Sequence, residues 1–301
     1  MKNIFRIEQV NDYCKLNNIE TLHPLVSIID YSKTEINYTE HSHFYYGVYA
    51  IFLKETDCGE LRYGRNSYDY QEGSLVFVQP GQMLELVKSK NTNTRKGWAL
   101  MFHPDLILGT DLAKRISEYT FFSYAINEAL HTSERERKMI IELFDKIQFE
   151  INQPIDKHSR KLIINNIQLF LDYCLRFYDR QFIMREHANK GILEKFENEL
   201  QRYFKSNKPQ LIGLPSVAHF ADLLHLSANY FGDLIKKETG KTAQEFIQLQ
   251  MMHIAKDKVL DISKPLNEVA YELGFKYPQH FTRMFKKNIG ISPSEFRNVH
   301  A

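Results

Sequence analysis

Short apolar runs separated by turn-forming residues dominate the first third of the chain. The runs are rich in β-branched and aromatic residues and lie at 25–29, 44–52, 74–78 and 98–102. Clusters of Gly, Pro, Asn and Asp separate them, which is the pattern of strands joined by tight turns. Residues 1 to about 102 are therefore expected to form a small sandwich or barrel of antiparallel strands.

The pattern then changes to helical spacing. The segment 134–149 has apolar residues at the 3, 4 and 7 spacing of one helix face, and Gln153-Pro154 interrupts it. The next segment, 161–182, is apolar around most of its circumference. Such a helix must be covered on more than one side, so we expect it to pack on the strand domain and on a second copy of the chain. Packing entirely within one chain is the alternative. The polar stretch 184–190 is expected to be a linker.

Two helical segments near the C-terminal end are near copies of each other, 50 residues apart. The pairs Tyr230-Phe231 and Glu245-Phe246 of the first correspond to His280-Phe281 and Glu295-Phe296 of the second. In each copy a short helix, a tight turn and a second helix follow one another, which is the helix-turn-helix pattern. A helix over 243–260, roughly 27 Å long, joins the copies. The two second helices can therefore lie about 34 Å apart and enter successive major grooves of DNA.

Residues 214–298 resemble the double helix-turn-helix domain of the AraC/XylS transcriptional regulators. The segments that carry the resemblance include Leu226-Ser227, 236–240, 269–275, 281–287 and 290–297. In that family a cupin-like sensor domain commonly precedes the DNA-binding domain, and helices between the two form a dimer.

The resemblance implies an α+β fold in three parts. These are a cupin-like β-barrel sensing domain over 1–125, a helical dimerisation segment over 126–183, and an all-α tandem helix-turn-helix domain over 190–301.

The outward faces of the two second helices carry the candidate DNA contacts. The second copy presents Gln279, Thr282 and Arg283. Gln279 can pair with adenine and Arg283 with guanine, and both match base-reading positions of the family. A solvated face or a phosphate contact is the alternative for each. The first copy presents Asn229 and Asp233 as candidate base contacts. Candidate phosphate contacts are Lys236, Lys276, Lys286 and Lys287.

Two places depart from the family's pattern. Gly232 and Asp233 stand where relatives often carry a long polar or basic side chain, so we expect the first copy to make weaker or altered contacts. Met251 stands in the linker helix where an arginine is frequent, and this leaves open how the two halves are locked together.

A second resemblance concerns the strand region. The stretch 72–82 resembles the second half of a cupin barrel, and His41 and His43 would lie in the first cupin motif, on one side of a strand. The carboxylate and the third histidine of a cupin metal site are missing, so neither a metal nor a cofactor is expected. We expect His41, His43 and Tyr45 to line a pocket for an organic effector. A purely structural barrel is the alternative.

Basic residues concentrate in the part that carries the repeat. Residues 190–301 contain 16 Lys and Arg against 12 Asp and Glu, a net charge of +4, and the chain total of +2 leaves −2 for residues 1–189. This asymmetry favours a polyanionic partner for the C-terminal part. The three cysteines, Cys14, Cys58 and Cys174, have neither disulfide nor metal-site spacing.

Other classes of protein find little support in the sequence. It contains no Ser-His-Asp, Cys-His, P-loop or G-x-G-x-x-G arrangement, so we do not expect an enzyme. It shows neither a signal-peptide pattern nor an apolar run of about 18 residues, so we expect a cytoplasmic protein without a membrane partner.

The expected function is sequence-specific, DNA-binding transcription regulation. The expected partners are double-stranded DNA, a small-molecule effector, a second copy of the chain and, as a further candidate, RNA polymerase. A metal-dependent cupin enzyme fused to a helical domain and a helical adaptor that has lost DNA binding are the alternatives.

Overall fold

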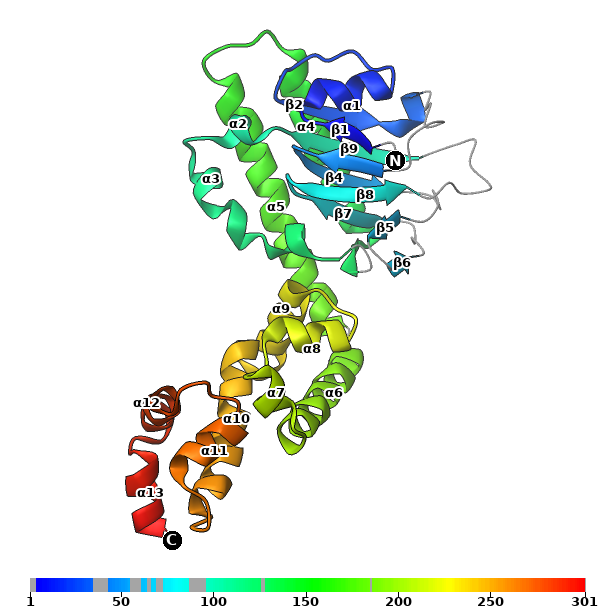
Figure 1. The fold of residues 1–301 in the computed structure, drawn as a ribbon. Helices are drawn as coiled ribbons and strands as arrows, with labels where there is room; N and C mark the ends of the chain where they lie inside the picture. The colour runs from blue at the N-terminus through cyan, green and yellow to red at the C-terminus, as the bar shows by residue number, and fades with distance from the viewer. Residues whose placement is uncertain are drawn as a thin grey trace. The chain divides into compact units, whose positions relative to one another are not determined.

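The fold is that of a computed structural model. The structure describes residues 4–34, 43–54, 61–63, 66–68, 73–86, 96–125, 128–184 and 186–300. The chain divides into two compact units, residues 1–184 and residues 185–301. Strands occur in the first unit, and the second is helical (Figure 1).

The ten described strands of the first unit form two sheets of five. One sheet has the order β1 (Ile4–Ile7), β3 (His43–Tyr46), β8 (Gln82–Leu86), β5 (Leu61–Tyr63) and β6 (Asn66–Tyr68). The other has the order β10 (Leu130–His131), β7 (Ser74–Val78), β4 (Tyr49–Lys54), β9 (Gly97–Phe102) and β2 (Val26–Asp30). The strand pairs are antiparallel except for β1 and β3, which run parallel.

The two sheets enclose one apolar core. Phe44, Tyr46 and Leu84 from the first sheet belong to the same buried cluster as Phe52 and Met101 from the second. These residues alternate along their strands with residues of the opposite face, as in a sandwich. Among the described strands neither sheet closes into a ring, so the closed cupin barrel that the resemblance implied is not found there.

Short helices border the strands. They are α1 (Val10–Leu16), η1 (Tyr31–Lys33), α2 (Pro104–Ile107), α3 (Asp111–Arg115), η2 (Ile116–Glu118) and η3 (Thr120–Ser123). α1 supplies Val10, Tyr13 and Cys14 to the core between the sheets.

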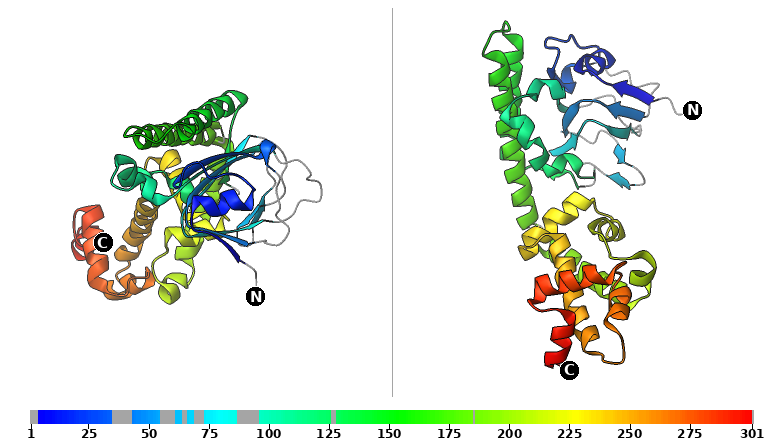
Figure 2. Two further views of the ribbon diagram at one scale, coloured as in Figure 1. Left: turned by 90° about the horizontal axis from the view of Figure 1, so that it is seen from above. Right: turned by 60° about the vertical axis from the view of Figure 1, so that its left-hand side comes forward.

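Two long helices, α4 (Glu134–Asn152) and α5 (Ser159–Met184), lie side by side against the second sheet (Figures 1 and 2). Phe144 of α4 packs between Trp98 of β9 and Phe170 of α5, at ring-centroid distances of 6.5 and 5.2 Å. The helical spacing of 134–149 and the break after it are therefore confirmed.

The packing of α5 is one-sided within the chain. Ile163, Ile167 and Phe170 are fully buried, whereas Leu162 and Leu169 keep 42% and 43% of their surface exposed. The apolar circumference of this segment predicted that the helix would be covered on more than one side. Within the described part of the chain, the side that carries Leu162 and Leu169 is not covered.

The C-terminal end of α5 is tied to the sheet. The Arg180 guanidinium donates to Glu136 Oε1 at 2.7 Å and to the His131 carbonyl at 2.6 Å, and Gln181 Oε1 accepts from the His131 amide. The next helix begins at Glu186, within the stretch 184–190 that was expected to be an irregular linker.

The second unit contains eight described helices. They are α6 (Glu186–Lys205), α7 (Lys208–Ile212), α8 (Val217–Leu223), α9 (Ala228–Thr239), α10 (Ala243–Leu260), α11 (Leu266–Glu272), α12 (Pro278–Ile289) and α13 (Pro293–His300). The predicted bounds of the joining helix, 243–260, are confirmed by α10. Phe196 of α6 packs on Phe220, Phe231 and Phe246, so α6 completes the core of the first copy.

Candidate DNA-binding interface

Local capping fixes both second helices of the repeat. α9 begins where the Ser227 hydroxyl accepts from the Tyr230 amide, and it ends at Gly240, whose φ is +71°. α12 begins with Pro278 and ends at Gly290, whose φ is +95°. Serine or proline at the start and left-handed glycine at the end are standard helix boundaries. The sequence thus sets where each helix begins and ends.

The faces of α12 separate cleanly. Phe281 and Phe285 point into the core, where their rings are 5.6 Å apart. The exposed residues are Gln279, His280, Thr282, Arg283, Lys286, Lys287 and Asn288. The predicted contacts Gln279, Thr282, Arg283 and Lys286 recur at spacings of three and four, so they share one side of the helix.

Most polar groups on this side are available to a partner. In the described part of the chain, the side chains of Gln279 and Arg283 make no hydrogen bond or ion pair. The hydroxyl of Thr282 donates to the Pro278 carbonyl at 3.2 Å, so its proton is already used. Gln279 and Arg283 therefore retain the donors and acceptors that base recognition requires.

α9 presents a smaller polar surface. Asn229 and Lys236 are exposed, whereas Gly232 and Asp233 are only partly so. Its buried face consists of Tyr230, Phe231, Leu234 and Ile235. The long exposed side chains that mark α12 are thus fewer on α9.

The turn before α12 carries a further cation. Lys276 is exposed, and its ammonium lies 5.6 Å from the centre of the Tyr277 ring. Tyr277 in turn packs edge-on against His280 at 5.4 Å. A cation over an aromatic face is held near it without losing its charge. Lys276 can therefore still meet a phosphate.

An ionic network holds the second copy to the joining helix. Glu272 of α11 accepts from Lys258 of α10 and from Lys264 of the loop between them. The Glu272 side chain is only 12% exposed, and the hydrogen bonds from Lys258 and then Lys264 keep the pKa of its carboxyl below the usual value. Arg297 of α13 adds bonds to the carbonyls of Val259 and Asp261 at 2.6 and 3.2 Å.

This network was missed by sequence reasoning because its members lie 8 to 38 residues apart and follow no local pattern. Met251, which stands where an arginine is frequent in the family, is 2% exposed and packs in the core. The second copy is instead held to the C-terminal end of α10 by the contacts of Glu272 and Arg297.

A backbone contact adds to the network. Gly274, in the turn between α11 and α12, has a φ of +91°, and a Cβ built on it would lie 2.8 Å from the carbonyl carbon of Gly213. Gly213 follows α7, ahead of the first copy. The second helix-turn-helix copy thus contacts the end of α7 through a direct approach of two glycine backbones.

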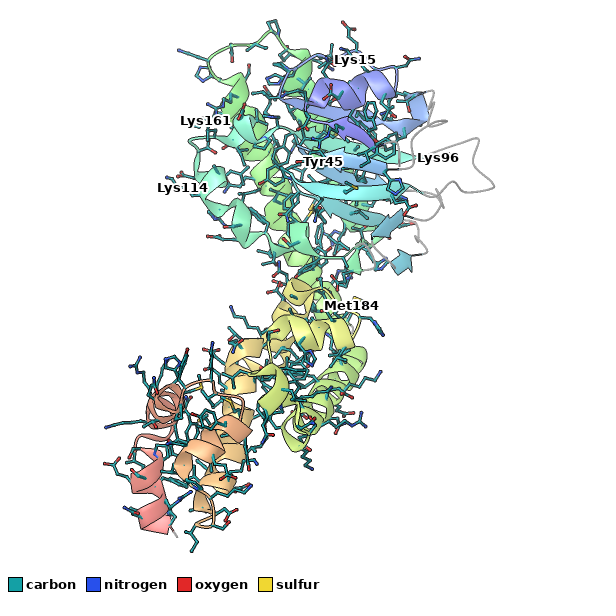
Figure 3. All side chains as sticks on the ribbon, in the orientation of Figure 1. Lys15, Tyr45, Lys96, Lys114, Lys161 and Met184 are labelled. Carbon is teal, nitrogen blue, oxygen red and sulfur yellow. The ribbon has the colours of Figure 1, made fainter. Side chains whose placement is uncertain are left out.

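The predicted effector residues lie in the first unit. His41 is outside the described residues. His43 and Tyr45 lie on β3, on the face opposite to the core residues Phe44 and Tyr46; Tyr45 is labelled in Figure 3. His43 Nε2 is 3.8 Å from a Glu85 oxygen, and the Arg6 guanidinium lies 4.8 Å from the Tyr45 ring centre.

The described residues also bear on metals and membranes. They contain no group of three or more His, Cys, Asp or Glu side chains arranged to hold a metal ion. Among the helices described, none combines the length and the apolar character needed to cross a bilayer.

Comparisons with known proteins agree with this geometry. Residues 220–298 match the family model of a helix-turn-helix domain. The chain is 23% identical to the uncharacterized HTH-type transcriptional regulator YfiF of Bacillus subtilis, over 86% of this chain and 79% of that protein. It is 35% identical to the uncharacterized transcriptional regulatory protein YesN of the same organism, over 25% of this chain and 21% of that protein.

Among solved structures, the C-terminal domain of the response regulator yesN from Fusobacterium nucleatum is similar. It is 24% identical, with a TM-score of 0.31, over 35% of this chain and 95% of that one.

The C-terminal domain is therefore a tandem helix-turn-helix domain of the AraC type. The chain is a DNA-binding transcription regulator, as the sequence predicted.

Proposed function

We propose that α12 performs most of the sequence reading. The observation that carries this proposal is the exposed side of α12, where Gln279 and Arg283 keep their hydrogen-bonding groups unused in the described part of the chain. Arg283 is one helical turn beyond Gln279, so both can reach base edges of one major groove. We assign guanine to Arg283 and adenine to Gln279.

Lysines around this helix bind phosphates. Lys276, Lys286 and Lys287 are exposed beside the reading face, and Lys236 occupies the corresponding place on α9. Such contacts fix the position of the protein on the duplex without selecting a sequence. Asn229 and Asp233 contribute weaker base contacts from α9, because the glycine between them supplies no side chain.

The first unit senses a small-molecule effector and forms the dimer. Leu162 and Leu169 leave an apolar strip of α5 exposed, and a second copy of the same helix would cover it. The regulator acts in the cytoplasm, has RNA polymerase as a candidate partner, and has no catalytic activity of its own.

Selection from a random duplex library with the purified chain tests the proposal. Enrichment of one motif with two contacted blocks, about 10 base pairs apart, is expected. A failure to enrich any sequence would favour the adaptor without DNA binding. Stoichiometric metal in the purified protein, together with loss of folding on chelation, would favour the metal-dependent enzyme.

A further inference from the structure

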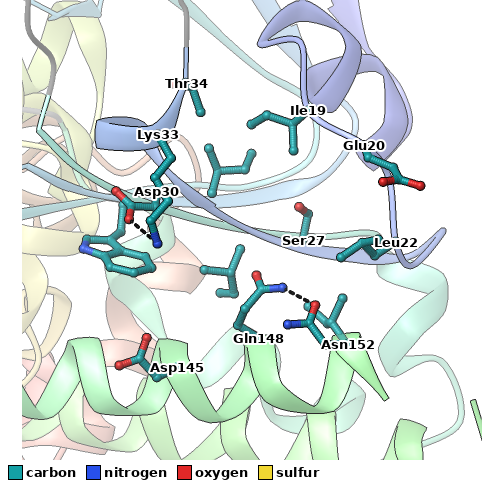
Figure 4. A pocket seen from close by; sticks show the side chains of 14 residues that line it. Ile19, Glu20, Leu22, Ser27, Asp30, Lys33, Thr34, Asp145, Gln148 and Asn152 are labelled. Atoms are coloured by element: carbon teal, nitrogen blue, oxygen red, sulfur yellow. Dashed lines mark hydrogen bonds and ion pairs between the residues drawn. The ribbon is translucent and has the colours of Figure 1, made fainter. Parts of the chain in front are cut away.

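A pocket of about 380 Å³ lies between α4 and the edge strand β2 (Figure 4). This volume is within the usual range for small-molecule sites. Figure 4 shows Asp145, Gln148 and Asn152 projecting from α4, with Ser27 and Asp30 on the strand opposite. The pocket reaches both faces of this edge strand, because its lining includes Ile28 and Asp30 on one face and Ser27 and Ile29 on the other, and Ile29 belongs to the core between the sheets.

Apolar side chains form much of the pocket wall. Trp98, Ile28 and Ile151 line it together with Ile19 and Leu22 of the segment that joins α1 to β2. Leu22 is 51% exposed. Exposed apolar surface beside a tryptophan can contact the apolar body of a ligand.

Some polar groups of the pocket already form hydrogen bonds or ion pairs within the chain, and others do not. Asp30 accepts from the amide and hydroxyl of Ser32, and it pairs with Lys33 at 3.1 Å. The Gln148 amide donates to Asn152 Oδ1 at 2.8 Å. Within the described residues, the carboxylates of Glu20 and Asp145 make no hydrogen bond or ion pair.

The unused groups define the charge of the ligand. Lys33 is neutralised by Asp30, which leaves the carboxylates of Glu20 and Asp145 and the carbonyl oxygen of Gln148 facing the cavity as acceptors. A protonated amine satisfies carboxylates with short, charge-assisted hydrogen bonds, and a cation is also attracted by an indole face. An anionic ligand would meet two uncompensated negative charges.

We propose that this pocket binds a small organic amine with an apolar body, and that the amine is the effector of the regulator. The effector role rests on the proposed function of the first unit. The site differs from the predicted one, since His43 and Tyr45 are not among the residues that line it.

The position of the pocket offers a route to regulation. α4 forms one wall of the pocket and packs through Phe144 on Phe170 of α5, the helix proposed to form the dimer. A ligand that contacts both β2 and α4 stabilises the arrangement of α4 in which the ligand can contact both walls of the pocket at once. Only such a difference in affinity between two arrangements can change their populations.

The single tryptophan of the chain gives a direct assay, because Trp98 lines this pocket. Titration of the full chain with 2-phenylethylammonium and hexylammonium, excited selectively at the indole, should give a saturable change in emission. The neutral analogue 2-phenylethanol is the matched ligand control. Asp145→Asn should weaken binding of the amine about tenfold, since one charge-assisted contact is lost. Asp257→Asn, an exposed aspartate of α10, is the control variant.

Failure of both amines to change the emission, or equal binding of the alcohol, overturns the pocket assignment. The affinity of the selected duplex is then measured with and without the amine. Amine binding that leaves this affinity and the oligomeric state unchanged overturns the effector role. If the amines do not bind while the duplex does, the pocket inference alone fails and the proposed reading of DNA stands.

Discussion

The side chain of Thr282 illustrates what single residues of α12 can offer to DNA. Its hydroxyl proton goes to the Pro278 carbonyl, so the oxygen can only accept and the methyl group can only make apolar contact. The oxygen can therefore accept from the amino group of adenine or cytosine, and the methyl group can contact the methyl group of thymine. Arg283 and Gln279 carry no such restriction, which makes them the stronger readers.

Replacement of Lys286 and Lys287 together by alanine should reduce the salt dependence of binding. Each phosphate contact that is lost removes about 0.9 from the slope of log affinity against log salt concentration. Titrations at several salt concentrations measure the slope. Lys195→Ala, an exposed lysine of α6, is the control and should leave it unchanged. An unchanged slope in the double variant would exclude a phosphate role for both lysines.

The exposed faces of α9 and α12 could be predicted from the sequence, because the repeat aligns Phe231 with Phe281. The helical period then assigns each of the remaining positions to the buried or the exposed face. The bond from Thr282 to Pro278 could not, since it depends on a rotamer. The partial burial of Asp233 also depends on packing that the period does not reveal.

At the scale of elements, capping explains why the boundaries of α10 were predictable. Thr242 and Glu245 form a reciprocal capping box at its start. The stretch 184–190 shows the converse. It is polar but contains no Pro or Gly, and Glu, Ala and Lys favour helix. Polarity alone does not end a helix, so α6 begins at Glu186.

Glu272→Gln should destabilise the second unit by about 1.5–3 kcal/mol, the value of hydrogen bonds to a charged group. Urea unfolding of the variant measures the loss. Glu268→Gln, on the exposed side of the same helix, is the control. An equal effect of the two variants would show that the network adds no stability.

The same pair of variants predicts a dependence on pH. Because the pKa of folded Glu272 is below its usual value of 4.5, its contribution is fully present above that pH and is lost as the pH falls through the folded pKa. The difference in stability between wild type and Glu272→Gln should therefore shrink below about pH 4.5. A difference that persists in strong acid would contradict an ionic origin.

Gly274→Ala should cost more stability than Gly290→Ala. Both glycines have φ above +90°, so alanine is strained at each by about 1–2 kcal/mol. A Cβ at Gly290 meets nothing within 4 Å, whereas one at Gly274 would overlap Gly213. Overpacking of this kind adds about 1–3 kcal/mol. Thermal unfolding compares the two, and equal losses would mean that the glycine contact is unimportant.

At the scale of the whole molecule, the sequence predicted an α+β chain with a strand region followed by helices, but it could not choose between sandwich and barrel. Both place alternate residues of every strand inside, so the apolar runs look alike. The partner strands decide the matter, and the pairing of β4 with both β7 and β9 depends on contacts far apart in sequence.

Leu162→Arg together with Leu169→Arg should convert the proposed dimer into a monomer. Both side chains are exposed on α5, and two charges there would be buried without partners in a dimer. Sedimentation velocity measures the mass. Ile262→Arg, at a residue 77% exposed in the second unit, is the control. A wild-type chain that sediments as a monomer would contradict the proposed dimer.

α12 is proposed to perform most of the sequence reading, and the most direct test of this role replaces Arg283. Once a preferred duplex is known, the affinity of wild type and Arg283→Ala is measured for every single base-pair substitution in it. The variant should lose about 1–3 kcal/mol on the preferred duplex and should lose discrimination at one guanine. Asn229→Ala, on α9, should change the profile less. An Arg283→Ala profile identical to that of the wild type would contradict the account.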